Sequence, residues 1–212
     1  RLRALDVCAV SDALDALGLP ASVAGLKPLS AQRKIAGAAV TVKLGTTPPS
    51  EHKRHLGTAA ILACQAGDVI VVQQSTGIDC AGWGGVLCVG AQLKEVSGVI
   101  VEGPARDIDE ARELGFPVYA RSVTATTARG RVYEQGFNCI IQVGDVEVKP
   151  GDYVIADGSA VAFVPRDRVE EVLVCAERIA DRERLMILAL KSGEAITEVM
   201  GKNYETMLEE SK

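Results

Sequence analysis

Arg106 and Asp107 are the residues whose types and position most clearly suggest chemistry. They follow the β-branched run Val99-Ile-Val, and a helical pattern begins directly after them. Segments that leave a buried strand and open a helix are where α/β folds tend to build their sites. An arginine there can bind a carboxylate through two parallel hydrogen bonds, and an aspartate can hold a hard divalent cation. The pair therefore predicts a small anionic substrate that is handled with a metal ion.

The same aspartate also fits a purely structural role. Asp107-Ile-Asp-Glu110 matches the helix capping box, with aspartate in place of serine or threonine. On local sequence alone, a helix cap beside a surface arginine is the favoured interpretation. The two interpretations are compatible, because one carboxylate oxygen can cap a helix while the other faces a metal.

A second candidate is the run Gly84-Gly85-Val86-Leu87, at the predicted start of a helix. Two glycines allow the backbone to approach a ligand closely, and the amides of a first helical turn bind carboxylates or phosphates. Taken alone, a plain glycine turn that opens a core helix is the better interpretation.

A basic cluster, His52-Lys53-Arg54-His55, follows a Pro-Pro loop. Folded over a pocket, it would attract an anionic substrate. Its two histidines are three residues apart and share one helix face, but the sequence identifies no third metal ligand. A solvated helix face is therefore the favoured interpretation.

The composition narrows the class of protein. The 212 residues carry a formal net charge of -5 without a strong run of one sign, which argues against nucleic acid or a membrane as a partner. The six cysteines form no CxxC motif, so we expect reduced, mostly buried thiols in a cytoplasmic protein. No apolar stretch is long enough to span a bilayer, and no signal peptide is visible.

Helical and strand patterns alternate through the middle of the chain, which predicts a parallel sheet with crossover helices. Expected helices cover residues 5–17, 50–64, 86–96, 107–114 and 168–190, and expected strands cover 34–44, 69–72, 99–101 and 118–121. The β-rich stretches 139–148 and 153–163 depart from this alternation and favour a mixed α/β architecture with a second β layer. We expect one domain over residues 1–192 and a polar tail over 193–212.

Six segments, in order, carry a resemblance to a known family. They are Ser11-Asp-Ala-Leu-Asp-Ala-Leu-Gly, Ala66-Gly-Asp-Val-Ile-Val-Val, Gly84-Gly-Val-Leu, Gly98-Val-Ile-Val-Glu-Gly-Pro-Ala-Arg-Asp, Glu113-Leu-Gly-Phe-Pro-Val-Tyr-Ala-Arg and Lys149-Pro-Gly-Asp-Tyr-Val-Ile-Ala-Asp-Gly. Together they resemble the RraA-like family, which includes the 4-hydroxy-4-methyl-2-oxoglutarate / 4-carboxy-4-hydroxy-2-oxoadipate aldolases. The resemblance covers roughly residues 5 to 190.

The resemblance implies a three-layer β/β/α fold of the swivelling, phosphohistidine-like type, assembled as homotrimers or homohexamers with the site at a subunit interface. It assigns Asp107 to a bound Mg²⁺ or Mn²⁺ and Arg106 to the substrate. The amides of Gly84, Gly85, Val86 and Leu87 would hold the pyruvate-like end. A metal chelated by a 2-oxo acid acts as a Lewis acid and stabilises an enolate.

One departure from the family pattern concerns Gly85, because the aldolases usually carry an acidic residue at that position. The other branch of the family, resembling the RNase E regulators, typically lacks the metal aspartate that is kept here as Asp107. Gln73-Gln-Ser-Thr76 would supply different polar contacts. Glu177 and Glu183 are candidates for an acid or base donated to a neighbouring subunit.

The sequence therefore predicts a divalent-metal-dependent lyase acting on a small 2-oxo acid, by retro-aldol cleavage or by decarboxylation of the oxaloacetate type. A non-enzymatic RraA-like regulatory or binding protein is the alternative. In that alternative, Asp107 is only a helix cap.

Overall fold

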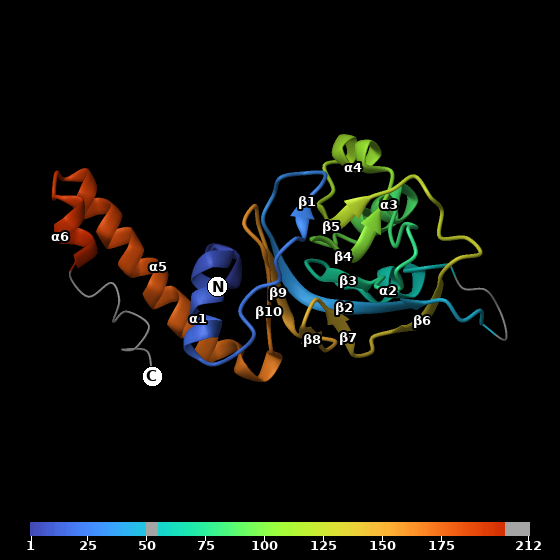
Figure 1. Ribbon diagram of the computed structural model, residues 1–212, viewed down its shortest axis with the longest axis horizontal. Coiled ribbons are helices and arrows are strands. Elements are labelled where there is room, and N and C mark those ends of the chain that lie inside the picture. Colours follow the sequence, from blue (N-terminus) through green and yellow to red (C-terminus); the bar gives the residue numbers. More distant parts are fainter. Residues whose placement is uncertain (50–54, 202–212) are drawn as a thin grey trace.

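The run Val69-Ile-Val-Val forms a strand buried on both faces, at the centre of a mixed α/β fold in the computed structural model (Figure 1). The structure describes residues 1–49 and 55–201. Its strands are β1 (Lys27–Pro28), β2 (Ile35–Gly45), β3 (Val69–Gln73), β4 (Gly98–Ala105), β5 (Val118–Val123), β6 (Tyr133–Phe137), β7 (Ile141–Val143), β8 (Val146–Val148), β9 (Tyr153–Ala156) and β10 (Val161–Val164). Its α-helices are α1 (Val7–Ala16), α2 (Thr58–Ala63), α3 (Gly85–Leu93), α4 (Ile108–Leu114), α5 (Val169–Lys191) and α6 (Ile196–Gly201), with short 3₁₀ turns at Leu2–Ala4 and Arg166–Arg168.

The main sheet has the strand order β1-β5-β4-β3-β2-β9-β10, with β6 also paired to β2. Strands β2 to β5 are parallel neighbours, whereas β1, β6, β9 and β10 pair antiparallel. The first half of β2 pairs with β9, and its second half pairs with β3 and β6. This one long strand therefore connects the antiparallel β9–β10 part of the curled sheet to its parallel part. The predicted mixed α/β class is confirmed.

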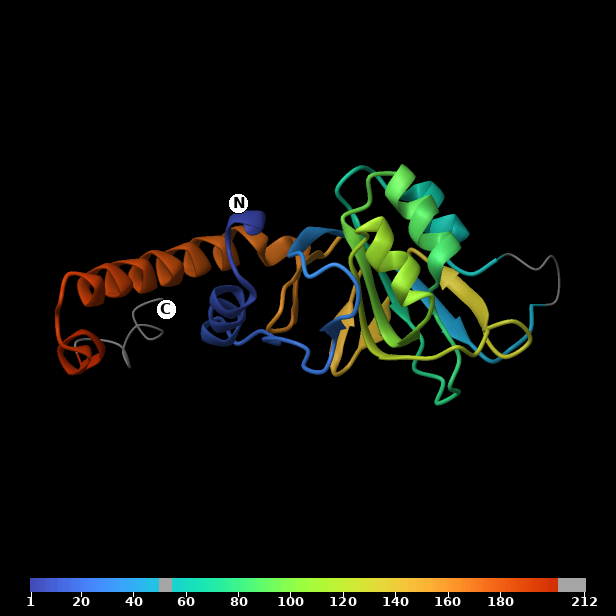
Figure 2. The same cartoon turned by 90° about the horizontal axis from the view of Figure 1, so that it is seen from above.

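Helices α2, α3 and α4 cover one face of the parallel strands (Figure 2). Their apolar side chains, among them Ile61, Leu87 and Ala111, pack against β2, β3 and β4 in one core cluster. On the other face, the β7–β8 hairpin packs Ile141, Val143 and Val148 against the same strands. Because both faces are covered, the central stretches of β3 and β4, residues 69–72 and 99–101, are wholly apolar and β-branched.

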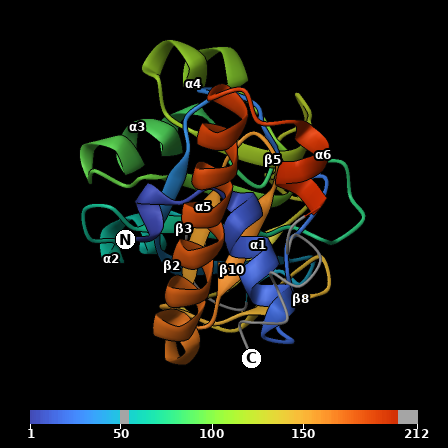
Figure 3. The same ribbon diagram turned by 90° about the vertical axis from the view of Figure 1, so that its left-hand side faces the viewer.

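Helices α1 and α5 lie side by side against β9 and β10 (Figure 3). Asp6 caps α1, because its carboxylate accepts a hydrogen bond from the Ala9 amide at 2.9 Å. The first half of α5 buries Val172, Ala176 and Ile179, whereas its second half extends away from the sheet (Figure 2).

Four segments differ from the sequence prediction. The helix expected over 50–64 is α2 alone within the described residues, because Gly57 adopts a left-handed conformation with φ 73° and interrupts any helix before Thr58. Strand β4 runs beyond 99–101, to Ala105, through an irregular register with β5. Strand β6 was not predicted, and the tail contains α6, which packs Val199 near α5.

The cysteines behave largely as expected. Cys64, Cys80, Cys88 and Cys175 are buried free thiols, Cys139 is half-buried, and Cys8 is exposed. Among residues 1–49 and 55–201, no helix combines the length and the apolar character needed to cross a membrane.

Candidate active site

A cavity of about 630 Å³ opens beside the start of α3 and the end of β4. One wall carries Trp83, Gly84, Val86, Leu87, Arg106 and Asp107. The rest of the lining comes from distant segments and includes His55, Arg129, Glu134 and Phe137. The cavity therefore brings together the two runs that the sequence singled out, together with a wall that it did not predict.

Asp107 stands between α3 and α4, with its backbone in the left-handed region at φ 56° and ψ 43°. This conformation turns its carboxylate away from its own helix, so the predicted capping box is wrong and no side-chain cap forms on α4. Instead, Asp107 Oδ2 accepts a hydrogen bond from the Gly85 amide at 2.9 Å. Arg106 Nε lies 3.3 Å from the same oxygen. Asp107 therefore caps the neighbouring helix α3.

The close approach of the two segments requires glycine at position 84. A Cβ there would lie 2.8 Å from Asp107 Oδ2 and 3.2 Å from Arg106 Cγ. The backbone at Gly84 is extended, with φ -158°, a conformation that any residue can adopt. Glycine is therefore required at this position because a side chain would not fit. The Trp83 carbonyl accepts a hydrogen bond from the Arg106 amide at 3.0 Å, which joins the segments a second time.

The first turn of α3 borders the cavity. The first N–H groups of a helix have no acceptor within that helix, and the helix dipole favours an anion there. Gly85 donates its amide to Asp107 and does not line the cavity, whereas Gly84, Val86 and Leu87 do. Of the five residues predicted to bind substrate, these three and Arg106 border the cavity, and Gly85 does not.

Strand β6 supplies a part of the cavity lining that the sequence analysis missed. Val42 pairs with Phe137 and Leu44 pairs with Glu134, so these two β6 residues share the face of β2 that packs against α2 and α3. Glu134 Oε2 accepts a hydrogen bond from the Gly57 amide at 2.8 Å. The Tyr-Glu-Gln-Gly-Phe run has aromatic residues at both ends, but a five-residue strand that contains a glycine is a weak signal.

A match to a protein-family model shows which family this chain belongs to. The model of the RraA-like family (Aldolase/RraA) matches residues 7–163. This chain belongs to the RraA-like family. The match ends at β10, so α5 and α6 lie beyond it.

Relatives of this RraA-like chain include proteins of different lengths. Protein DlpA of Legionella pneumophila is 30% identical over 187 residues, which are 88% of this chain and 30% of that protein. This chain therefore spans about a third of the length of DlpA. A Halalkalibacterium halodurans protein named "Putative 4-hydroxy-4-methyl-2-oxoglutarate aldolase" is 28% identical over 178 residues, covering 84% of this chain and 81% of the relative.

Solved structures share the fold of this RraA-like chain. An uncharacterized protein from Pseudomonas syringae pv. tomato is 28% identical, with a TM-score of 0.82 and coverage of 92% of both chains. Streptomyces coelicolor RraAS2, described as an unusual member of the RNase ES inhibitor RraA protein family, has a TM-score of 0.74 at 23% identity and covers 88% of this chain and 92% of its own. At 23% identity, the similarity to RraAS2 shows a shared fold and nothing more.

The donor set of this RraA-like site fits a metal that keeps most of its water. Asp107 Oδ1 makes no hydrogen bond or ion pair within the described part of the chain, so one carboxylate oxygen remains for an ion. No group of three histidine, cysteine, aspartate or glutamate side chains converges among residues 1–49 and 55–201. Mg²⁺ is commonly bound through one or two carboxylates, waters and substrate oxygens, and such a shell fits Asp107.

Gly85 marks where the site departs from the aldolase pattern. A Cβ at this position would lie 3.1 Å from Asp107 Cβ and 3.6 Å from its Oδ2. An acidic side chain at 85 would therefore stand directly beside Asp107. Of the two acidic residues next to Gly85, Asp107 lines the cavity and Glu110 does not.

Several predicted contacts lie elsewhere. His52, Lys53 and Arg54 fall outside the described residues, but His55 lines the cavity. Gln74 does not line it and instead holds its own loop, through hydrogen bonds from Nε2 to the carbonyls of Ile78 and Cys80.

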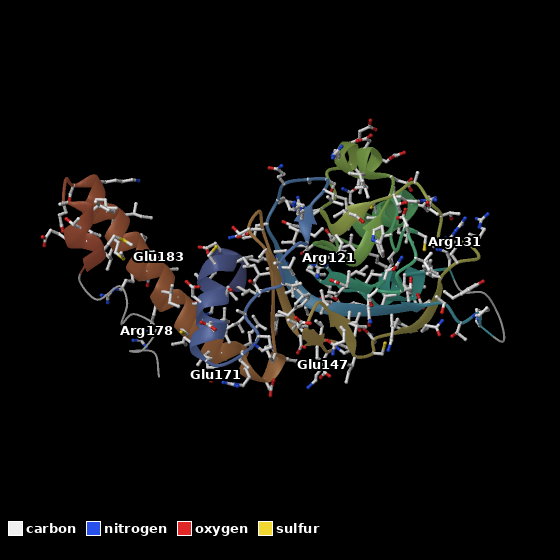
Figure 4. The ribbon with its side chains drawn as sticks, viewed as in Figure 1. Arg121, Arg131, Glu147, Glu171, Arg178 and Glu183 are labelled. Atoms are coloured by element: carbon white, nitrogen blue, oxygen red, sulfur yellow. The ribbon has the colours of Figure 1, made fainter. Side chains whose placement is uncertain are left out.

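The two α5 carboxylates are distant from the cavity of their own chain. Glu177 forms an ion pair with Arg1 at 2.8 Å. Glu183 lies at the opposite end of the molecule from Arg131, which follows the cavity residue Gly130 (Figure 4). Partial burial, with Asp6 and Asp12 nearby, raises the pKa of Glu183. Neither residue can act in the cavity of its own chain. The prediction that they serve as an acid or base therefore concerns only the cavity of a neighbouring subunit.

Proposed function

We propose that this RraA-like protein is a divalent-metal-dependent carbon–carbon lyase that acts on a small 2-oxo acid. The reaction is retro-aldol cleavage of a 4-hydroxy-2-oxo acid or decarboxylation of the oxaloacetate type. The observation that carries the proposal is the convergence of Arg106, Asp107 and the first turn of α3 on one cavity. The names of relatives as oxoglutarate aldolases support the choice of reaction class.

Each residue of the site has a role that follows from the chemistry of its side chain or backbone. Arg106 binds the substrate carboxylate through its guanidinium fork, and the amides of Val86 and Leu87 oppose negative charge that develops at the 2-oxo end. Asp107 would hold Mg²⁺ or Mn²⁺, and the ion would supply Lewis-acid polarisation of the 2-oxo group. The Gly85 amide and Arg106 fix the Asp107 carboxylate in place before substrate arrives.

Three further properties belong to this proposal. We expect a three-layer swivelling β/β/α domain, a homotrimer or homohexamer, and action in the cytoplasm. The free thiols are consistent with the cytoplasm, because reducing conditions keep cysteines unpaired. Sedimentation velocity would test the assembly.

Pyruvate release tests the proposed activity. Oxaloacetate and 4-hydroxy-4-methyl-2-oxoglutarate are each incubated with the protein in Mg²⁺ or Mn²⁺ and again in EDTA. We expect pyruvate only with metal, and a loss on the order of a hundredfold in Arg106→Lys, because lysine cannot reproduce the planar guanidinium fork. A wild-type protein that turns over neither substrate contradicts the proposal.

The alternative function is a non-enzymatic regulatory or binding protein. The likeness to a structure described as the RNA-processing inhibitor RraA from Thermus thermophilis, with 25% identity and a TM-score of 0.56, favours this candidate. It predicts that Asp107→Asn leaves partner binding and stability unchanged and that no divalent metal binds. Isothermal titration with Mn²⁺ separates the two candidates, because only the lyase requires metal binding.

A further inference from the structure

We propose that Glu134 is the proton-transfer residue of the retro-aldol step, acting in the cavity that Arg106 and Asp107 also line. This inference rests on the proposed function. Within residues 1–49 and 55–201, Asp107 and Glu134 are the two carboxylates that line the cavity. With Asp107 assigned to the metal and Gly85 in place of the usual acid, Glu134 is the remaining carboxylate for proton transfer.

A β-bulge directs Glu134 toward the cavity. Lys43 pairs with Gly136 and the next residue, Leu44, pairs with Glu134, so Gln135 is an extra residue in β6. Directly opposed residues share a face, and an extra residue moves every later side chain to the other face. Without it, Glu134 would oppose Gly45 and point away from the face of Leu44, which packs in the same core cluster as Trp83 and Leu87.

Glycine at position 45 accommodates this bulge. A Cβ at Gly45 would lie 2.8 Å from Gln135 Cγ, so the space above Gly45 is occupied by the extra residue. Bulges are frequent next to active sites because they redirect a side chain. Here the redirected side chain is a carboxylate.

A second contact holds the Glu134 carboxylate in place. Its Oε2 accepts the Gly57 amide hydrogen bond at 2.8 Å, although the two residues are 77 positions apart in the chain. A Cβ at Gly57 would lie 2.8 Å from Trp83 Cζ3, so Gly57 is in close contact with the residue that precedes Gly84. Glu134 is therefore held against the same part of the cavity wall from which α3 begins.

The proton balance of the cleavage requires such a group. The Glu134 carboxylate takes the proton of the C4 hydroxyl, the C3–C4 bond breaks, and its electron pair passes to the 2-oxo group, giving a carbonyl product and a pyruvate enolate. The protonated Glu134 then returns the proton to C3 of the enolate, and pyruvate is released. No oxidant or further reactant is needed. Decarboxylation of oxaloacetate releases CO₂ by breaking C3–C4 with no hydroxyl proton to remove, and its enolate takes the C3 proton from water, so this reaction does not need Glu134.

The difference between the two reactions provides the test. Glu134→Gln keeps an oxygen that accepts the Gly57 N–H but cannot take up a proton. We expect retro-aldol turnover to fall on the order of a hundredfold or more. Oxaloacetate decarboxylation should change by less than about threefold, with KM unchanged for both substrates. Glu110→Gln is the matched control, because it removes an exposed carboxylate near Gly85 that does not line the cavity.

Binding is measured separately from turnover. Trp83 is the single tryptophan of the chain and lines the cavity, so its fluorescence reports Mn²⁺ and oxalate binding. We expect Glu134→Gln to bind both as the wild-type protein does. An equal fall in both reactions indicates a structural role and overturns the inference, as does full retro-aldol activity. A wild-type protein that only decarboxylates also overturns it but leaves the lyase proposal intact, whereas absence of both reactions overturns both.

Discussion

The Asp107 carboxylate accepts the Gly85 amide hydrogen bond at 2.9 Å, so the residue that precedes α4 caps α3. Two segments 22 positions apart are thereby joined at one oxygen, Oδ2, which also pairs with Arg106. Substitutions at this junction separate structural from functional roles.

Asp107→Asn and Asp107→Ala should differ in stability but not in activity. Asparagine keeps an oxygen acceptor and tolerates the left-handed backbone, so we expect its free energy of unfolding to change by less than about 0.5 kcal/mol. Alanine loses the cap and is strained at positive φ, at a cost of roughly 1–3 kcal/mol. Both variants should lose turnover by on the order of a hundredfold. Urea unfolding and pyruvate release measure the two effects, and an active Asp107→Asn protein contradicts the metal assignment.

Gly84→Ala should damage the site, whereas Gly90→Ala should not. The added methyl at 84 meets Asp107 Oδ2 at 2.8 Å and displaces the Arg106–Asp107 pair, costing about 1–3 kcal/mol and most of the activity. At 90, within α3, the Cβ lies 3.6 Å from Ile61 Cδ1, an ordinary contact, so alanine should stabilise the protein by roughly 0.5–1 kcal/mol. Thermal unfolding of the two variants is the measurement, and equal effects would count against a steric requirement at 84.

Gly85→Asp should strengthen metal binding. The new carboxylate stands beside Asp107 and adds a second oxygen ligand, but without metal the two like charges repel each other. We expect Gly85→Asp to be less stable than Gly85→Asn in EDTA and to gain more from Mn²⁺. Differential scanning calorimetry with and without Mn²⁺ tests this, and an identical response of the two variants contradicts it.

Buried thiols make the protein less stable at alkaline pH. Burial raises the pKa of Cys88 to about 11 and that of Cys64 to about 12, from a usual value of 9.0. The folded state keeps these protons when the unfolded chain has released them. Their stabilising effect is therefore complete below pH 9 and is lost as the pH rises toward 11–12. Each thiol lowers the free energy of unfolding by about 1.4 kcal/mol per pH unit in that window.

Urea unfolding at pH 8, 9 and 10 measures this dependence. Cys64→Ala should unfold more easily at every pH but show a shallower decline above pH 9, because one titrating group is gone. Cys8→Ala is the control, since Cys8 is exposed. Equal slopes in the two variants would mean that the Cys64 thiol does not cause the decline.

The sequence determined the central part of this protein. Some features depend only on residues within a few positions of one another, so a pattern along the chain predicts them. They are the β-branched run at 69–72, the helical spacing of α1 and α5, and the Gly84-Gly85 and Arg106-Asp107 pairs. For the same reason, the two halves of the proposed metal and substrate site were identified as separate candidates.

Only the tertiary structure decided how these parts meet. The left-handed backbone of Asp107 turns its carboxylate toward Gly85, which a capping pattern read along one helix cannot reveal. The face on which Glu134 lies depends on one extra residue in the pairing of β6 with β2, and its carboxylate is held by Gly57 from a distant segment. Both arrangements depend on hydrogen bonds between segments that are far apart in the sequence, so they form only in the folded chain.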